Sequence, residues 1–406
     1  MSKKIKKKIP KLRFPEFKGD WESKYLDQVG DFKNGFNADK QAFGTGVEFV
    51  NLMDIFGKSE IHKTYLDRVE IPEKQLQQYK IQKGDVLFVR SSVKREGVGQ
   101  SCLVNDDFED TVYSGFIIRF REKSNTLYHL YKKYCFTESS FRKEILSFAT
   151  SSANTNINQD SLSQISLFYP SIAEQEKIAS FLGAIDKRLT QLRRKHELLQ
   201  TYKRGVMQKI FSQEVRFKGA ISLHFPDWEK KDFGDIVTKV SSKYDPTTSD
   251  TSYPCIELES IISNEGKLVK MFDSKEQQSI KNKFKSGDVL FGKLRPYLRK
   301  FISANFEGVC STEIWIFRGK KVSAKYLYYL VQTDKFYKIA NVTFGSKMPR
   351  SDWDFVSSFP FECPCKEEQE KIADFLTAID QKIEAVSRQV DRTEQFKKGL
   401  LQKMFV

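Results

Sequence analysis

Two basic stretches follow the same five residues, Gly-Asp-Val-Leu-Phe, which occur at 84–88 and again at 287–291. Arginine, lysine, serine and tyrosine side chains on loops donate to phosphate oxygens and to base edges, so both stretches are candidates for contact with nucleic acid. A basic loop is also commonly just a solvated surface, and that alternative stays open. The candidate contact residues are Arg90, Ser91, Ser92, Lys94, Arg95, Lys293, Arg295, Tyr297, Arg299 and Lys300.

A second pair of polar loops spans residues 150–158 and 343–350. Both are rich in side chains that form hydrogen bonds, and each leads towards a long helical segment. They are either linkers or a second set of base contacts. The candidates here are Asn154, Asn156, Asn158, Ser346, Lys347 and Arg350.

Residues that would support catalysis are scattered. The four histidines lie far apart in the sequence, and there is no Gly-x-x-x-x-Gly-Lys-Ser/Thr phosphate loop. Asp245-Pro246 is followed by Thr247, where the motif of amino-methyltransferases has a proline and an aromatic residue. Asp227, Glu229 and Lys231 have the residue types of a nuclease site. They surround Trp228, which we interpret as a packing residue at the start of a module, so we do not expect a nuclease site there. We therefore expect no catalytic site, metal or cofactor on this chain.

The charge balance favours a polyanionic partner. Lysine and arginine number 68 against 53 aspartate and glutamate residues, a formal net charge of +15 over 406 residues. Such an excess attracts nucleic acid or an anionic membrane surface. No apolar run reaches the roughly 18 residues of a membrane span, and the lysine-rich start is not a signal peptide. The six scattered cysteines are best read as reduced thiols, and we expect a cytoplasmic protein.

The chain repeats itself once. Residues 174–212 and 368–406 align without a gap, both begin Glu-Gln-Glu-Lys-Ile-Ala, and nearly half of the aligned positions are identical. The Gly-Asp-Val-Leu-Phe stretches recur in the same order upstream, with shorter spacing in the second copy. This is the behaviour of a duplicated module. The predicted division is 1–170 and 213–364 for two globular domains, and 171–212 and 365–406 for two long helices.

Short β-type runs such as 85–90 and 288–291, followed by helical stretches such as 127–136 and 324–339, predict an α+β fold for each globular domain. Apolar residues spaced by seven along each long helix predict that the two helices pair as a coiled coil, although packing of each helix on its own domain is the alternative. The predicted seam residues are Ile178, Leu182, Ile185, Leu189, Leu192, Leu199, Val206, Ile372, Leu376, Ile379, Ile383, Val386, Val390 and Leu400.

This layout resembles the specificity subunit of bacterial type I restriction-modification enzymes over essentially the whole chain. The supporting motifs are the two Gly-Asp-Val-Leu-Phe stretches, the opening from Phe14-Pro15 to Trp21, and the two helices starting Glu-Gln-Glu-Lys-Ile-Ala. The resemblance implies two target-recognition domains, each reading half of a bipartite double-stranded DNA sequence, and two antiparallel helices that dock methyltransferase subunits. It also implies that the partners hold S-adenosylmethionine and that a restriction subunit uses ATP and magnesium.

Two other functions remain to be weighed. A stand-alone nuclease or methyltransferase would turn over DNA by itself with magnesium or S-adenosylmethionine. A coiled-coil adaptor with incidental basicity would not bind DNA at all.

Overall fold

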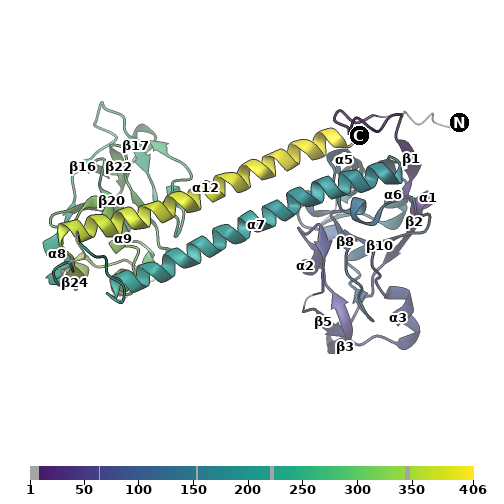
Figure 1. Cartoon of the computed structure of the whole chain (residues 1–406), viewed down its shortest axis with the longest axis horizontal. Helices are drawn as coiled ribbons and strands as arrows, with labels where there is room; N and C mark the ends of the chain where they lie inside the picture. Colours follow the sequence, from purple (N-terminus) through teal and green to yellow (C-terminus); the bar gives the residue numbers. More distant parts are fainter. Residues whose placement is uncertain (1–8, 64, 152–153, 220–223, 343–347) are drawn as a thin grey trace. The chain divides into compact units, whose positions relative to one another are not determined.

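The computed structural model describes residues 9–63, 65–151, 154–219, 224–342 and 348–406. The chain forms two compact units, residues 1–192 with 389–406 and residues 193–388. Each unit combines an α+β globule with part of both long helices, α7 (Ile172–Phe211) and α12 (Lys366–Met404), which Figure 1 shows in teal and yellow. The predicted fold class is confirmed, whereas the division into four segments stays a prediction.

The globule of the first unit is built on a five-stranded sheet in the order β2-β10-β6-β8-β4, with bounds Gly30–Asn34, Ile117–Glu122, Val86–Val89, Ser101–Val104 and Glu60–Ile61. A three-stranded sheet has the order β5-β3-β9, with bounds Asp67–Val69, Phe43–Val50 and Val112–Tyr113. Two smaller sheets are β11-β12-β7 (Thr150–Ser151, Thr155–Asn156, Ser91–Ser92) and β1-β13 (Glu22–Tyr25, Ser166–Tyr169). The helices of this globule are α1 (Leu26–Val29), α2 (Leu52–Ile55), α3 (Glu73–Tyr79), α4 (Lys132–Cys135), α5 (Ser139–Phe148) and α6 (Gln159–Ser163).

The globule of the second unit has a four-stranded sheet in the order β15-β23-β20-β21, with bounds Val237–Val240, Ile314–Gly319, Val289–Gly292 and Phe301–Ser303. A five-stranded sheet has the order β16-β19-β22-β17-β18, with bounds Lys243–Tyr244, Lys281–Phe284, Gly308–Ser311, Pro254–Ile256 and Phe272–Asp273. A small sheet pairs β14 (Glu229–Asp232) with β24 (Pro360–Cys363). The helices are α8 (Phe233–Ile236), α9 (Ala324–Leu330), α10 (Asp334–Ala340) and α11 (Trp353–Ser357).

The duplication seen in the sequence extends to strand order. β2-β10-β6-β8 in the first unit and β15-β23-β20-β21 in the second place the repeated Gly-Asp-Val-Leu-Phe strands, β6 and β20, at the same position in the sheet. The predicted β-type runs are confirmed. Both predicted helical runs are divided: 127–136 contains a short 3-10 helix (His129–Tyr131) followed by α4, and 324–339 is divided between α9 and α10.

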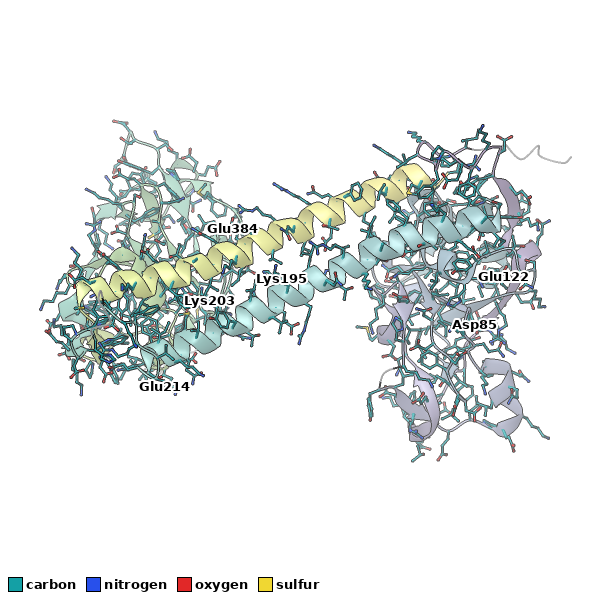
Figure 2. The ribbon with its side chains drawn as sticks, viewed as in Figure 1. Asp85, Glu122, Lys195, Lys203, Glu214 and Glu384 are labelled. Carbon is teal, nitrogen blue, oxygen red and sulfur yellow. The ribbon has the colours of Figure 1, made fainter. Side chains whose placement is uncertain are left out.

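The aspartate that precedes each repeated strand has a structural role. Asp85 and Asp288 are each 2% exposed or less, and each accepts a backbone N–H three residues earlier, which closes the turn into the strand. Arg121 binds Asp85 through Nε at 2.7 Å and Nη2 at 2.6 Å, and Arg318 binds Asp288 at 2.7 Å through the same two atoms. A buried carboxylate needs such pairing, because burial without it costs several kcal/mol. Asp85 is labelled in Figure 2.

The repeated Glu-Gln at the start of each long helix fixes that helix to its own globule. Gln175 is fully buried; its Nε2 donates to the carbonyls of Pro170 and Thr126, and its Oε1 accepts from the Tyr128 N–H. Gln369 makes the equivalent bonds to the carbonyls of Pro364 and Lys321 and to the Ser323 N–H. Three backbone groups that burial would otherwise leave unpaired are satisfied in each unit.

The neighbouring glutamates each hold an arginine from the chain that enters the globule. Arg13 contacts Glu174 at 2.7 and 2.6 Å, and Arg216 contacts Glu368 at 3.2 and 2.8 Å. Each glutamate interacts favourably with the helix dipole, as expected for an acid in the first turn of a helix. Each also forms a two-pronged ion pair with its arginine.

The two long helices run antiparallel. In the first unit the Nζ of Lys397 on α12 lies 2.5 Å from Oδ1 of Asp186 on α7. In the second unit the Nζ of Lys203 on α7, labelled in Figure 2, lies 2.7 Å from Oδ1 of Asp380 on α12. The two aspartates occupy equivalent positions of the repeat, as do the two lysines. A tyrosine hydroxyl of the adjoining globule donates to each aspartate at 2.9 Å, from Tyr134 and from Tyr329.

Each helix packs both on its partner helix and on the globules, so the two arrangements weighed from the sequence coexist. Ile178, Leu182, Leu400 and Met404 belong to the core cluster of the first unit, and Met207, Ile210, Ile372 and Leu376 to that of the second. Every predicted seam residue is buried or half-buried. The buried ones are Ile178, Leu182, Leu189, Leu192, Ile372, Leu376, Ile379, Val386 and Leu400, and the half-buried ones are Ile185, Leu199, Val206, Ile383 and Val390.

The ion pair at Asp186 predicts a dependence of stability on pH. Burial works to raise the pKa of Asp186, but the hydrogen bonds from Lys397 and Lys133 outweigh it and lower the pKa. An aspartate whose folded-state pKa lies below the unfolded value of about 3.9 stabilises the fold at higher pH and loses that effect on acidification. We expect the stability difference between the wild type and Asp186→Asn, measured by urea unfolding, to be constant near neutral pH. It should shrink below about pH 4; a difference that persists undiminished in acid would contradict this.

Candidate nucleic-acid interface

In the first unit the structure joins the two polar loops that the sequence presented separately. β7 (Ser91–Ser92) pairs antiparallel with β12 (Thr155–Asn156), with Ser91 opposite Asn156 and Ser92 opposite Thr155. Just before β7, the carbonyl of Arg90 accepts from the Ile157 N–H at 3.0 Å, and the N–H of Arg90 donates to the Phe116 carbonyl at 2.9 Å. The loops therefore form one surface on which three chain segments meet.

The second unit repeats this arrangement. Leu294 and Arg350 form an antiparallel bridge, and the N–H of Arg295 donates to the Pro349 carbonyl at 2.8 Å. The Lys293 carbonyl accepts from the Ser351 N–H at 2.9 Å, and the Lys293 N–H donates to the Glu313 carbonyl at 3.0 Å. These bonds are the equivalents, position by position, of those around Arg90.

The side chains on this shared backbone frame differ between the units. Where the first unit has Arg90, Ser91 and Asn156, the second has Lys293, Leu294 and Arg350. Backbone hydrogen bonds hold the frame, so the side chains are free to vary without loss of the pairing. Two surfaces with the same backbone frame and different hydrogen-bonding side chains are suited to bind two different ligands.

The predicted residues of the first unit differ in their engagement. Lys94 and Arg95 are exposed, and Arg95 Nη2 donates to the Leu146 carbonyl at 3.2 Å. Arg90 is half-buried and donates from Nη1 to the Gly115 carbonyl at 3.2 Å. Asn154 is exposed and its carbonyl accepts from Asn156 Nδ2 at 2.9 Å, whereas Asn158 caps α6 by accepting from the Ser161 N–H. Ser91, Ser92 and Asn156 remain half-buried in the paired strands.

In the second unit, Arg295 and Tyr297 are exposed, and Arg295 has a positive φ of 51°. Arg299 donates to Asp334 at 3.0 Å and lies over the Tyr337 ring, so it is engaged within the globule. Lys300 donates to the Leu258 carbonyl at 2.6 Å; burial is the main cause that lowers its pKa. Both use part of their hydrogen-bonding capacity within the globule and stay candidate contact residues. Ser346 and Lys347 lie outside the described residues.

Two further residues of this surface were not among the sequence predictions. Phe116 is 61% exposed although the two residues after it are fully buried. Its equivalent, Glu313, holds Arg350 through contacts of 3.0 and 3.3 Å. The sequence does mark these two residues. Each follows the repeated serine, Ser114 or Ser311, by two positions, and one copy has an apolar ring where the other has a carboxylate.

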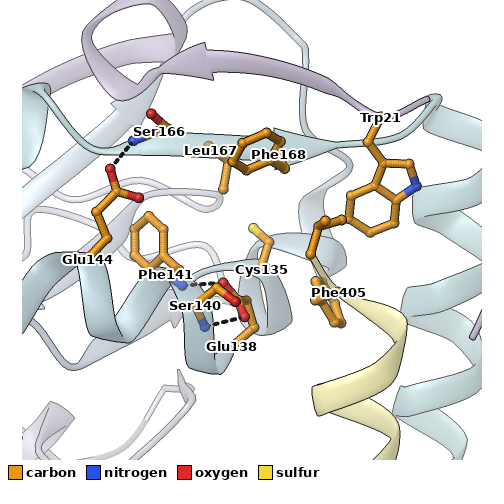
Figure 3. Close-up of a pocket in the computed structure, with 11 residues that line it drawn as sticks. Trp21, Cys135, Glu138, Ser140, Phe141, Glu144, Ser166, Leu167, Phe168 and Phe405 are labelled. Carbon is orange, nitrogen blue, oxygen red and sulfur yellow. Dashed lines mark hydrogen bonds between the residues drawn. The ribbon is translucent and has the colours of Figure 1, made fainter. Parts of the chain in front are cut away.

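A cavity of about 110 Å³ in the first unit provides no alternative site (Figure 3). Its carboxylates are engaged with backbone groups: Glu138 caps the start of α5 at Ser140 and Phe141, and Glu144 accepts from the Ser166 N–H at 3.1 Å. Phe405 from the end of α12 lines the cavity beside Trp21 and stacks on Tyr131. The cavity is a packing gap where α12 meets the globule.

Across the described ranges, no group of three or more histidine, cysteine, aspartate or glutamate side chains is placed to hold a metal ion. The same described part of the chain contains no helix that is long and apolar enough to cross a membrane. The six cysteines are free thiols, and for Cys102 burial raises the pKa to about 12.

Comparison with known proteins agrees with this geometry. A relative from Methanocaldococcus jannaschii, the type I restriction enzyme MjaVIII specificity subunit, is 23% identical over 71% of this chain and 72% of its own. The S subunit of a type I restriction-modification system from M. genitalium has the same fold, with a TM-score of 0.57, 15% identity and coverage of 98% of this chain and 99% of its own. A chain solved in a study of assembly and conformational transition of the type I system gives a TM-score of 0.59 at 16% identity, covering 95% and 97%.

The family model for the type I restriction modification DNA specificity domain matches residues 18–200 and again residues 226–392. The two matches correspond to the two copies of the repeat and together cover most of the chain. The chain therefore belongs to the family of type I restriction-modification DNA specificity proteins.

Proposed function

We propose that this chain is the sequence-specific DNA-binding subunit of a type I restriction-modification system and reads a bipartite target. The observation that carries the proposal is the paired-loop surface, which occurs once in each unit on the same backbone frame with different side chains. Each surface would read one half of the target, with Arg95, Lys94, Arg295 and Lys293 as candidates for DNA contact. The net charge of +15 suits a duplex partner.

The chemistry would belong to partner subunits. Modification subunits holding S-adenosylmethionine would methylate the target, and a restriction subunit using ATP and magnesium would cleave unmodified DNA. Because the long helices α7 and α12 carry the same repeated sequence, a docking surface for a modification subunit would occur twice, and we propose two such subunits per chain. A protein with this task would work on DNA in the cytoplasm.

Binding of the chain, alone or with its modification partner, to the target duplex should weaken steeply with salt. For about six phosphate contacts the association constant would fall roughly a thousandfold between about 50 and 200 mM salt, because bound counterions are released. Fluorescence anisotropy with the target duplex and a scrambled duplex of equal length measures this. An association constant that changes neither with salt concentration nor between the target and the scrambled duplex would contradict the proposal.

The same titration separates the alternatives weighed from the sequence. A coiled-coil adaptor would bind neither duplex, and a stand-alone enzyme would turn over DNA without its partners once magnesium or S-adenosylmethionine is added. We expect binding without turnover by the isolated chain.

A further inference from the structure

Phe116 and Glu313 occupy one equivalent backbone position in the two units. Each carbonyl accepts the N–H of the residue that begins the basic loop, Arg90 or Lys293. Each N–H donates to the hydroxyl of the repeated serine, from Phe116 to Ser114 at 3.3 Å and from Glu313 to Ser311 at 3.4 Å. The backbone is therefore fixed in the same way twice, while the side chain changes from an apolar ring to a carboxylate.

In the first unit the Phe116 side chain borders an open hollow of about 330 Å³. Its rim carries further exposed apolar side chains, Met53 at 75% and Tyr65 at 93% exposed. Single exposed apolar side chains are common on protein surfaces, but three that gather around one hollow are typical of a contact surface.

The polar lining of the hollow is acidic. Asp54 and Asp67 line it, and their described contacts are with Asn51, from its backbone N–H and from its Nδ2, both at 2.7 Å. Each of these contacts uses only Oδ2 of the carboxylate. Two carboxylates repel a phosphate but accept hydrogen bonds from an amino group. The hollow thus combines an apolar wall with acceptors, which suits a base edge and disfavours the DNA backbone.

An A·T pair fits that combination. In the major groove it presents the thymine methyl group and the adenine N6 amino donor, whereas a G·C pair offers the cytosine N4 amino donor but no methyl group, so the apolar wall is what favours A·T. Phe116 and Met53 match the methyl group, and the carboxylates match the amino group.

In the second unit the equivalent residue, Glu313, gives the surface a different hydrogen-bonding group. Glu313 is 28% exposed and holds the guanidinium of Arg350, which is 45% exposed, through two nitrogen atoms. A guanidinium fixed in this way loses little freedom when its remaining N–H groups bind guanine O6 and N7, the commonest specific arginine contact with DNA.

We infer that position 116/313 is a specificity-determining position in both units. Phe116, with the hollow beside it, reads an A·T pair in one half of the target, and Glu313 reads a G·C pair in the other half by positioning Arg350. The inference rests on the proposed function.

The test is methylation sequencing of DNA from cells that express the chain with its modification partner. Phe116→Ala should relax one A·T position in one half of the motif, and Arg350→Lys should relax one guanine in the other half. Discrimination at the affected position should fall about tenfold to a hundredfold in each case. Glu313→Gln should relax the same guanine to a smaller extent, since it keeps the shape and removes the charge that fixes Arg350.

Phe43→Ala is the matched control, because it removes another exposed ring, 41% exposed, from β3 of the same globule and lies outside the long helices and both basic loops. It should leave the motif unchanged. A motif unaltered by Phe116→Ala or by Arg350→Lys, or altered in both halves by either, would overturn the inference. If the wild-type pair produces no bipartite motif, the proposed function itself fails, so the two failures are distinct. Thermal unfolding of each variant, expected to match the wild type, excludes misfolding as the cause of relaxed specificity.

Discussion

Asp186→Ala is expected to lower the free energy of unfolding of the first unit by about 3 kcal/mol, the lower end of the cost of removing one partner from a buried ion pair. The carboxylate binds Lys397 at 2.5 Å, Lys133 at 2.9 Å and the Tyr134 hydroxyl at 2.9 Å, and thereby joins α7, α12 and the globule. Lys133 is only 10% exposed, so the substitution leaves a largely buried ammonium that keeps Glu60 alone as its anionic partner. Removing one side of such a pair costs more than the pair contributes, because the remaining charge stays buried.

Asp380→Ala should cost about 2 kcal/mol in the second unit, because it leaves Lys203, which is 15% exposed, with Gln332 as its remaining polar partner. Asp374→Ala on the same helix is the control. Its carboxylate pairs with Lys325 at 3.2 Å where both side chains are more than two-thirds exposed, so we expect a loss below about 1 kcal/mol. Urea unfolding followed by circular dichroism measures all three. Equal losses in Asp186→Ala, Asp380→Ala and the control would refute the structural role of the two aspartates.

The largest expected effect on recognition comes from the basic loop of the second unit. Lys293→Ala combined with Arg295→Gly should weaken binding tenfold to a hundredfold through one half of the target, from the loss of base or phosphate contacts. Glycine is chosen at 295 because φ is 51° there, a conformation that alanine adopts at a cost. The binding frame should persist, since Lys293 takes part in it through its backbone N–H and carbonyl.

Anisotropy titrations with duplexes in which one half or the other is scrambled would locate the effect. Lys94→Ala in the first unit is the matched change and should act on the opposite half only. If the double variant loses binding equally through both halves, Lys293 and Arg295 serve a shared scaffold and not one reader.

Much of the architecture could be predicted from the sequence, because the duplication displays itself in local patterns. The strands at Gly-Asp-Val-Leu-Phe and the two long helices depend on periodicity and on repeated motifs, which a single chain shows directly. Lys203 and Lys397 occupy equivalent positions of the repeated helices. Their partners, Asp380 and Asp186, follow only once the register of an antiparallel pair is known.

The candidate site was harder to predict because it depends on long-range pairing. Ser91 lies opposite Asn156, and Leu294 opposite Arg350, across long stretches of intervening chain. Nothing local in either loop indicates its partner. The same limit applies to Arg299 and Lys300, because their partners, Asp334 and the Leu258 carbonyl, are distant in sequence.

The most direct test of the central claim, two readers on one chain, is methylation sequencing of DNA from cells that express the wild-type chain together with its modification partner. We expect one motif made of two specific halves separated by unspecified bases. A chimaeric chain, in which only the first globule is exchanged for that of another family member, should change one half and keep the other. A single uninterrupted motif, or a change in both halves on that exchange, would contradict the claim.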